Sequence, residues 1–493
     1  MASYTDYVAR MQRIADIRYA SAVLQWDQET YLPPKGAEAR GRQLSTLSEL
    51  AHEQFSNESL GALLDELLAS GNLDAAQRRN VELSREDYVK NRKYSADLVR
   101  RLSDATNKAF HSWIDARRRN DFKVFEPALG EMITLKKEEA GVLGYTVHPY
   151  DALLNEYEKG ATTAQLDAVF GELLPQLKGL LDELLAQPPA DDSFLKRNYP
   201  ADTQWQWGLH LLRQLGFDEA AGRQDRSEHP FTTSFAPQDV RITTRIDEAD
   251  FGNMTWSTIH ELGHALYEQG LPADQYGLPL GEAASLSMHE SQSRLWENNV
   301  GRSRAFWEHY LPELRTYFPE QLAAVDTDAF FRAINKVQPS LIRTEADEVT
   351  YHFHVYIRYT LEKALLDGSL AVADIPDYWR ESYRRWLGVT PPDDRTGALQ
   401  DVHWSHGSFG YFPTYSLGSL YAAQFFAAAE KAVPGLDEGL RTGKTENLLG
   451  WLRQEIHAHG RRYTSDELCR RITAQSLSSA YFTTYIRTKY SLV

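Results

Sequence analysis

The chain has 493 residues, of which 42% are hydrophobic and 25% charged, the composition of a globular protein with a large core. Its 53 basic and 69 acidic side chains give a net charge of −16, which leaves no basic surplus for a nucleic-acid-binding protein. The one cysteine, Cys469, excludes an intramolecular disulfide scaffold and a zinc site built from cysteines.

The N-terminal segment predicts a helix rather than a targeting signal. Residues 1–20 carry charges throughout and lack the apolar run that a secretory signal needs. No stretch of the chain approaches 18 consecutive apolar residues, so we expect no membrane-spanning helix and no membrane partner. With one cysteine and no targeting segment, the expected location is the cytoplasm.

The first two hundred residues predict long amphipathic helices, because leucines and alanines recur at three- and four-residue spacing. The run of two prolines and two aspartates at residues 187–192 predicts a turn or linker. A further helix is expected at residues 203–215. The long helices before the linker are expected at residues 4–24, 37–52, 96–119 and 163–185.

The sequence pattern changes near residue 229. Residues 229–235 and 239–246 alternate and are rich in Thr, Phe, Val and Ile, which predicts two short strands joined by a turn at 236–238. Helical spacing then returns, so we predict a mostly α fold with a small antiparallel β-sheet beside the next helix. The later helices are expected at residues 281–296, 303–318, 343–366, 376–387, 415–432 and 446–458.

The residues that follow the strands, His260-Glu261-Leu262-Gly263-His264, have the pattern of a hydrolytic metal site. Two histidines four positions apart lie on one helix face about 6 Å apart along the axis, so both imidazoles can reach one ion. Zinc accepts imidazole nitrogen, and a hydrolytic site keeps one position for water. Glu261 is in the position of the general base of a zinc peptidase. The alternative interpretation is a helix with two core histidines.

Gly263 weakens the predicted helix by about 1 kcal/mol relative to alanine. That cost is tolerable if another part of the chain must approach the backbone closely at this position. The neighbouring apolar residues keep helical spacing, and no proline interrupts them.

Two histidines leave a catalytic zinc site incomplete, so a third ligand is needed. The best candidate is Glu290, 26 positions after His264, in the run His289-Glu290-Ser291-Gln292. Its carboxylate would give two imidazoles and one carboxylate around the ion. Glu268, one turn beyond His264, and Glu282 are rivals that spacing alone does not eliminate.

Two further histidine pairs predict structure rather than metal binding. His352 and His354 are two positions apart in a helical stretch and therefore point to different sides. His457 and His459 have the same spacing, so for both pairs a core role is the better interpretation, although either pair could hold a single functional histidine.

The chain resembles the carboxypeptidase Taq family of metallocarboxypeptidases in ordered motifs that span nearly its whole length. Near the N-terminus, residues 23–30 followed by Pro33 look like the opening signature of that family. The other matching motifs, each present without departure, are HPF at 229–231, DxRxT at 239–243, HELGH at 260–264, HESQ at 289–292, IRxxAD at 342–347 and GxxQDxHW at 397–404.

The resemblance implies a zinc- or cobalt-dependent exopeptidase that releases C-terminal residues from peptides with broad preference and little activity on proline. It implies a helical, saddle-shaped fold similar to the thimet-type oligopeptidases, with a deep groove, and a homodimer. On this basis we expect a single metallocarboxypeptidase unit in which residues 1–200 form one wall of the groove and residues 201–493 hold the catalytic region.

A carboxypeptidase must recognise a free carboxylate, which arginine does best through its planar, always-charged fork. Arg343 matches the arginine of the IRxxAD motif and is the predicted anchor. The alternative is that Arg343 only pairs with Asp347, four positions on along the same helix. Both roles could hold, with Asp347 orienting the guanidinium.

The other candidate residues belong to the matched motifs or the loop after them. His229 and Tyr415 are candidate donors to the developing oxyanion or to substrate backbone. Tyr411 lies in the same loop as Tyr415 and is a further substrate-binding candidate, together with Gln400 and His403. Asp401 could line the substrate end of the groove or orient a metal-bound imidazole, and Arg241 is either structural or functional.

Two other functions compete with a metallocarboxypeptidase. The first is an endo-acting metallo-oligopeptidase of the same architecture, which a carboxylate anchor at Arg343 argues against. The second is a catalytically silent peptide-binding protein that keeps a structural metal, which an intact Glu261 argues against.

Overall fold

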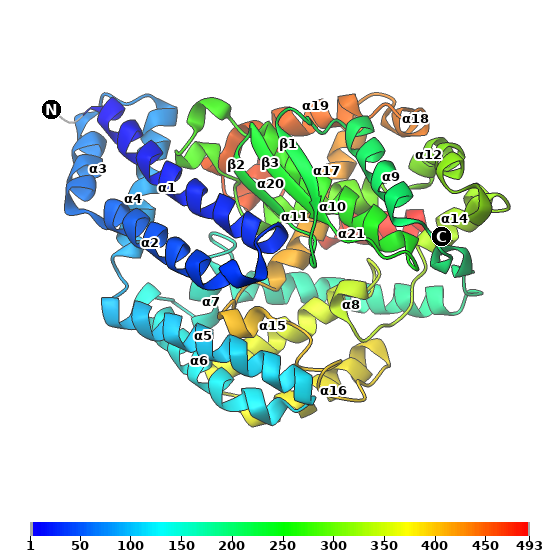
Figure 1. The fold of residues 1–493 in the computed structure, drawn as a ribbon, viewed down its shortest axis with the longest axis horizontal. Coiled ribbons are helices and arrows are strands. Elements are labelled where there is room, and N and C mark those ends of the chain that lie inside the picture. The colour runs from blue at the N-terminus through cyan, green and yellow to red at the C-terminus, as the bar shows by residue number, and fades with distance from the viewer. Residues whose placement is uncertain (1–2, 492–493) are drawn as a thin grey trace. The chain divides into compact units, whose positions relative to one another are not determined.

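The computed structural model describes residues 3–491, which form a mostly helical fold with one three-stranded sheet (Figure 1). The chain divides into two units, each assembled from three segments. Unit 1 contains the chain up to Arg92, Ala190–Ile334 and Phe425–Ser476, and unit 2 contains Lys93–Pro189, Asn335–Gln424 and the chain from Leu477. The division expected at residue 200 coincides with neither unit, whereas the predicted linker at 187–192 spans one of the crossings between them.

The N-terminal part of unit 1 is a helical layer with its own apolar core. Side chains of Ser3, Asn57 and Asp74 accept backbone N–H groups at the starts of three of these helices, which fixes where they begin. Tyr7, Leu64 and Val81 are fully buried together in this core. The helices are α1 (Tyr4–Thr30), α2 (Ala37–Ser56), α3 (Glu58–Ser70) and α4 (Ala75–Asn91).

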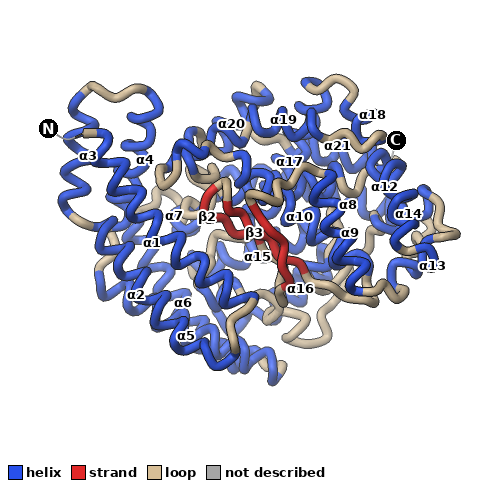
Figure 2. The backbone as a smooth tube through the Cα atoms, turned by 45° about the horizontal axis from the view of Figure 1, so that its top comes forward, coloured by secondary structure: helices blue, strands red, loops and turns tan. Residues whose placement is uncertain are grey.

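The sheet lies in unit 1 with strand order β1-β3-β2 (Figure 1), and its strands are drawn in red in Figure 2. The strands β2 (Thr232–Ala236) and β3 (Asp239–Thr244) pair antiparallel, which confirms the predicted pair. The prediction of a wholly antiparallel sheet was wrong, because β1 (Gly222–Arg226) pairs parallel to β3. Its sequence, GRQDR, is polar and carries no apolar alternation, so periodicity gives no signal for it.

Helix α10 (Phe251–Gly270) packs against β2 and β3 and carries the HELGH motif. Val240 and Ile242 of β3 are fully buried, as are Met254, Ile259 and Leu262 of the helix. The remaining helices of unit 1 are α9 (Ala201–Gln214), α11 (Leu286–Arg294), α12 (Arg304–Tyr317), α13 (Pro319–Leu322), α14 (Thr327–Ile334), α18 (Leu436–Arg441), α19 (Glu446–Glu455) and α20 (Ser465–Thr473).

Unit 2 is helical, and two of its helices, α5 and α8, have the bounds that the sequence predicts. His352 and His354 are fully buried and bond Ser416 and Tyr383 at 3.0 and 2.9 Å, which confirms the interpretation as core histidines. The helices are α5 (Ala96–Arg119), α6 (Phe122–Leu143), α7 (Pro149–Leu154), α8 (Thr163–Leu185), α15 (Tyr351–Asp367), α16 (Ile375–Leu387), α17 (Pro413–Ala432), whose last residues belong to unit 1, and α21 (Ser479–Lys489).

Two predicted helices start later than expected, because a polar side chain accepts backbone N–H groups near each observed start. The helix expected from residue 343 begins at Tyr351, since the Asp347 carboxylate accepts the N–H groups of Val349 and Thr350. The helix expected from residue 281 begins at Leu286, where Ser285 accepts the N–H of Met288. Between residues 3 and 491, none of the helices combines the length and apolar character needed to cross a membrane.

Glu362 is a fully buried carboxylate of α15 in unit 2. It accepts hydrogen bonds from the Tyr150 hydroxyl at 2.8 Å, the Trp404 indole at 2.8 Å and the Gly410 N–H at 3.1 Å. Burial raises the pKa of Glu362 to about 7, against the lowering effect of these donors.

Replacing Glu362 by glutamine should change how stability depends on pH. Between its ordinary pKa and about 7 the folded protein keeps a proton that the unfolded chain has lost, so stability from the neutral carboxyl falls as pH rises. Glutamine cannot ionise, so the urea midpoint of Glu362→Gln relative to wild type should increase from about pH 5 to about pH 8. Glu381→Gln, with its side chain 76% exposed on α16, is the control. A constant difference between Glu362→Gln and wild type across this range would contradict the account.

Candidate metal centre

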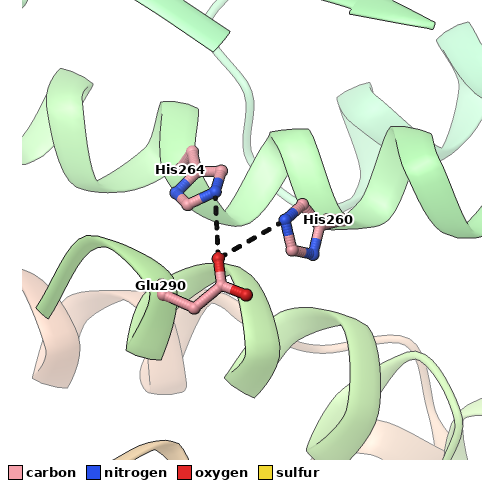
Figure 3. A group of neighbouring side chains, drawn as sticks. All are labelled: His260, His264 and Glu290. Carbon is pink, nitrogen blue, oxygen red and sulfur yellow. Dashed lines mark ion pairs between the residues drawn. The ribbon is translucent and has the colours of Figure 1, made fainter. Parts of the chain in front are cut away.

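Helix α10 presents His260 and His264 on one face, with their ring centroids 5.0 Å apart (Figure 3). The opposite face explains this orientation, because Ile259, Leu262 and Leu266 are fully buried in unit 1. The two imidazoles therefore project together from adjacent turns, as the four-residue spacing predicts.

Glu290 reaches the same point from α11. Its Oε2 lies 3.6 Å from Nε2 of His260 and 3.5 Å from Nε2 of His264 (Figure 3). One donor atom from each of the three residues lies within 4.8 Å of the others. Two ligands about 2.0–2.1 Å from a tetrahedral zinc are separated by about 3.3–3.4 Å, so the donor spacing fits one small divalent ion.

Gly263 explains how the two helices come close enough. A Cβ at this position would lie 2.5 Å from the carbonyl oxygen of Gln292 and 2.5 Å from Cα of Ser293. The backbone of α11 therefore packs directly on α10. This is the kind of close approach that would make a glycine at position 263 tolerable in the helix. Gln292 is held in turn by His457, whose Nε2 lies 2.9 Å from its amide oxygen.

The imidazole of His260 is oriented by Glu297, whose Oε2 lies 2.8 Å from its Nδ1. Glu297 belongs to a π-helical segment, Leu295–Val300, that continues α11. Arg294 joins the two carboxylates, with Nε 2.7 Å from Glu290 and a terminal nitrogen 3.0 Å from Glu297. Burial raises the pKa of both carboxyls, but the charges of Arg294 and the imidazoles lower it by more. The pKa of Glu290 therefore falls well below its ordinary range, and the pKa of Glu297 falls to about 2.

His264 is supported differently, because its Nδ1 lies 2.5 Å from Nδ1 of His289. Nε2 of His289 lies 2.7 Å from Oε1 of Glu268, so this rival ligand contacts an imidazole rather than the cluster. The other rival, Glu282, pairs with Arg461 at 2.7 Å. Burial lowers the pKa of His264 to about 4, although the hydrogen bond to Glu290 acts in the opposite direction. The lowered pKa favours the neutral imidazole that a metal requires.

Glu261 is buried beside these ligands and accepts a hydrogen bond of 2.6 Å from the hydroxyl of Thr232. Burial raises the pKa of Glu261, while neighbouring His260 and the Thr232 hydroxyl lower it. Thr232 opens β2 directly after the HPF motif, and this position next to a motif is the signal by which the sequence could have identified it.

His229 is exposed in the bend before β2, and its carbonyl accepts a hydrogen bond of 2.6 Å from Ser227. Arg241 of β3 pairs with Asp239 and lies over the rings of Trp26, at 4.4 Å, and Phe235, at 5.0 Å. Arg241 therefore joins the opening signature on α1 to the sheet, which is a structural contact within unit 1.

Arg343 lies in unit 2, in a 3₁₀ turn, and only 6% of it is exposed. Its Nε bonds Asp401 at 3.0 Å, and a terminal nitrogen bonds the Tyr351 hydroxyl at 2.9 Å. Arg358, fully buried on α15, bonds the second oxygen of Asp401 at 2.6 Å and Gln400 at 2.7 Å. Two guanidinium groups thus share one carboxylate.

Two of the alternatives considered for this region do not hold. Arg343 pairs with Asp401 and not with Asp347, whose carboxylate is used by backbone N–H groups at the start of α15. Asp401 does not orient a metal-bound imidazole, because both of its oxygens bond arginines and the Nδ1 atoms of His260 and His264 face Glu297 and His289.

The remaining candidates also lie in unit 2, around Arg343. The guanidinium of Arg343 is 4.8 Å from the ring centre of Tyr415, whose hydroxyl is 3.1 Å from Nε2 of His403. Gln400 accepts the backbone N–H of Arg343 at 2.9 Å. Tyr411 packs its ring 5.3 Å from those of His403 and Tyr415. Burial lowers the pKa of His403 to about 3, against the effect of Asp401, so its imidazole is neutral.

Sequence reasoning missed several residues that orient the candidate site. Glu297 follows Glu290 by seven positions, two turns along, which is a usable signal for a second acidic residue on the same face. Arg358 and the pairing of His289 with Glu268 have no such signal, because they depend on how helices pack. The missed residues are Thr232, Glu268 as a partner of His289, Arg294, Glu297 and Arg358.

Comparisons with known proteins find similar sequences and structures over nearly the whole chain. The sequence profile of the family described as Carboxypeptidase Taq (M32) metallopeptidase matches residues 6–490. Thermostable carboxypeptidase 1 of Thermus thermophilus is 42% identical over 99% of this chain and 98% of its own length. Among solved structures, one named CHT is 60% identical with a TM-score of 0.98 over 99% of each chain. An M32 carboxypeptidase from Deinococcus radiodurans R1 is 42% identical with a TM-score of 0.97, over 99% of this chain and 98% of that one.

Replacing Gly263 by alanine should destabilise the protein although alanine favours helices. Its Cβ would overlap the α11 backbone, and overpacking of this kind costs about 1–3 kcal/mol. Gly450→Ala in α19 meets no atom within 4 Å and should instead stabilise by up to about 1 kcal/mol. Urea unfolding of both variants measures the difference, and equal effects would refute the close contact.

Proposed function

The chain belongs to the carboxypeptidase Taq (M32) family of metallopeptidases, and on this premise we propose that it removes C-terminal residues from peptides with a zinc ion bound by His260, His264 and Glu290. The observation that carries the proposal is the cluster of these three side chains with the buried carboxylate of Glu261 beside it. Cobalt suits the same donors, since imidazole and carboxylate do not select between the two ions. Broad preference with little activity on proline is part of the proposal.

The donor set supports a catalytic rather than a closed structural site. Three protein ligands leave one position for water, and a divalent ion bound there would polarise the scissile carbonyl and lower the pKa of that water toward neutrality. The protein supplies the orientation of the ligands, through Glu297 at His260 and Arg294 at Glu290.

We assign Glu261 as the general base. It takes a proton from the attacking water and passes it to the leaving amine, so peptide hydrolysis ends with the carboxylate as it began. The hydrogen bond from Thr232 holds one oxygen of Glu261, and two residues further along α10 the backbone of α11 packs on Gly263. Both contacts fix the carboxylate relative to His260.

The charges around Arg343 support a role in binding the carboxylate of a peptide. Arg343 and Arg358 carry two positive charges against the single negative charge of Asp401, and His403 is neutral because its pKa is about 3. Of the other carboxyls of unit 2, Glu362 is bonded to Tyr150, Trp404 and Gly410, and Asp347 accepts backbone N–H groups at the start of α15. A buried excess of one positive charge favours an anionic ligand.

The other candidates follow from their chemistry. We propose His229 and Tyr415 as donors to the oxyanion or to the substrate backbone, and Gln400, His403 and Tyr411 as substrate-binding residues. The ring contacts between Arg343 and Tyr415 and the hydrogen bond between His403 and Tyr415 support this grouping for the residues of unit 2. A homodimer and a cytoplasmic location complete the proposal, on the family resemblance.

Glu261→Gln should abolish turnover without loss of metal. Glutamine has nearly the same shape but accepts no proton, so kcat should fall by at least about 100-fold. Zinc content, determined by elemental analysis, should stay at the wild-type level because Glu261 is not among the three donors. Parallel loss of metal and activity would instead support a structural metal in a peptide-binding protein.

Arg343→Ala should lower kcat/KM for peptides with a free C-terminus by about 30-fold or more, the equivalent of about 2 kcal/mol for a buried charged contact. Folding is protected because Arg358 still pairs with Asp401. Peptides with an amidated C-terminus should already be poor substrates of the wild type, and the variant should lose little on them. Arg380→Ala, at an exposed arginine of α16, is the control. Equal cleavage of acid and amide peptides would favour the endo-acting oligopeptidase.

A further inference from the structure

Glu268 and His289 form a continuous line of hydrogen-bonding groups with the proposed metal ligand His264 in unit 1. Oε1 of Glu268 lies 2.7 Å from Nε2 of His289, and Nδ1 of His289 lies 2.5 Å from Nδ1 of His264. Nε2 of His264 is the atom that faces Glu290. His264 and Glu268 stand one turn apart on α10, and the ring of His289 from α11 fits between them.

The donors and acceptors along this line fix the position of each proton. An ionised carboxylate only accepts, so Nε2 of His289 carries the hydrogen that Glu268 receives. Of two Nδ1 atoms 2.5 Å apart only one carries the hydrogen between them, and a His264 that binds a metal through Nε2 carries its own hydrogen on Nδ1, so Nδ1 of His289 is the acceptor. Nδ1 of His264 must therefore donate, which leaves the lone pair of its Nε2 directed at the cluster.

The surroundings hold this line in place. The ring of Tyr267 lies 5.4 Å from that of His289, and its hydroxyl accepts the N–H of Ala284 in the segment before α11. Although burial raises the pKa of Glu268, hydrogen bonds to His289 and Ser234 outweigh it and keep the carboxyl ionised. No more than 20% of the side chain of Glu268, His289 or His264 is exposed.

The second imidazole of the cluster lacks an intermediate ring. Nδ1 of His260 contacts the carboxylate of Glu297 directly at 2.8 Å, the usual arrangement for a metal-binding histidine. His264 has no carboxylate in this position, and the His289 ring spans the gap to Glu268 instead. A carboxylate thus orients each ligand, directly at His260 and through the ring of His289 at His264.

We propose that Glu268 and His289 are positioning residues that hold His264 in the one tautomer able to bind the metal. The inference deepens the proposed function and rests on its metal site. Neither residue contacts the ion or the substrate in this role. Donation from Nδ1 of His264 makes its Nε2 a better electron donor to the metal. Loss of the hydrogen bonds from His264 through His289 to Glu268 therefore weakens metal binding and not only activity.

The test measures zinc affinity by competition with a chromophoric chelator, using the full-length protein. Glu268→Ala and His289→Phe should each raise the dissociation constant about 10- to 100-fold. Because both act through one line, the double variant should bind about as weakly as the weaker single variant. Glu282→Ala is the matched control, since this glutamate of unit 1 pairs with Arg461 instead and should bind zinc as the wild type does.

The outcomes separate the inference from the function on which it rests. A wild type that binds no zinc would remove the metal site itself. If the wild type binds zinc, and Glu268→Ala and His289→Phe bind it with the same affinity as the wild type, the positioning role is overturned. Multiplied losses in the double variant would also overturn it, because independent packing defects add in free energy. Should His289→Phe not fold, Glu268→Ala against Glu282→Ala decides, and equal affinities would again refute the proposal.

Discussion

The contact between α10 and α11 at Gly263 is the constraint on which the candidate site depends. A side chain as small as a methyl group would meet the α11 backbone at 2.5 Å, so only glycine permits this packing. The contact brings Glu290 to the paired imidazoles and places His289 and Glu297 against their outer nitrogens. One helix pair thus supplies the proposed ligands and most of the groups that orient them.

Charge balance distinguishes the two clusters. A bound metal requires neutral imidazoles, and with both neutral the carboxylates around the proposed metal site exceed the arginines by two, which matches a divalent cation. In unit 2, two arginines share one aspartate, which leaves one positive charge for an anion. A metallopeptidase that binds a terminal carboxylate needs both a site for a divalent cation and a site for an anion. The groups counted at the metal site are Glu261, Glu268, Glu290 and Glu297 against Arg294 and Arg302.

Local pattern predicted the parts of the fold that local forces decide. Periodicity gave α5 and α8 with their observed bounds, and alternation gave β2 and β3. The four-residue spacing of His260 and His264 needs only a helix, and Glu290 needed the added signal of its motif. Strand β1, the π-helical placement of Glu297 and the pairing of Arg343 with Asp401 escaped prediction, because each depends on a partner distant in sequence or on tertiary packing.

The central claim is that one divalent ion binds between two helices through these imidazoles and this carboxylate. Anomalous diffraction at the zinc absorption edge from crystals of the zinc-loaded protein tests it most directly. The account predicts a single strong peak about 2.0–2.2 Å from Nε2 of His260, Nε2 of His264 and an oxygen of Glu290. A peak elsewhere, or at a site that omits Glu290, would contradict it.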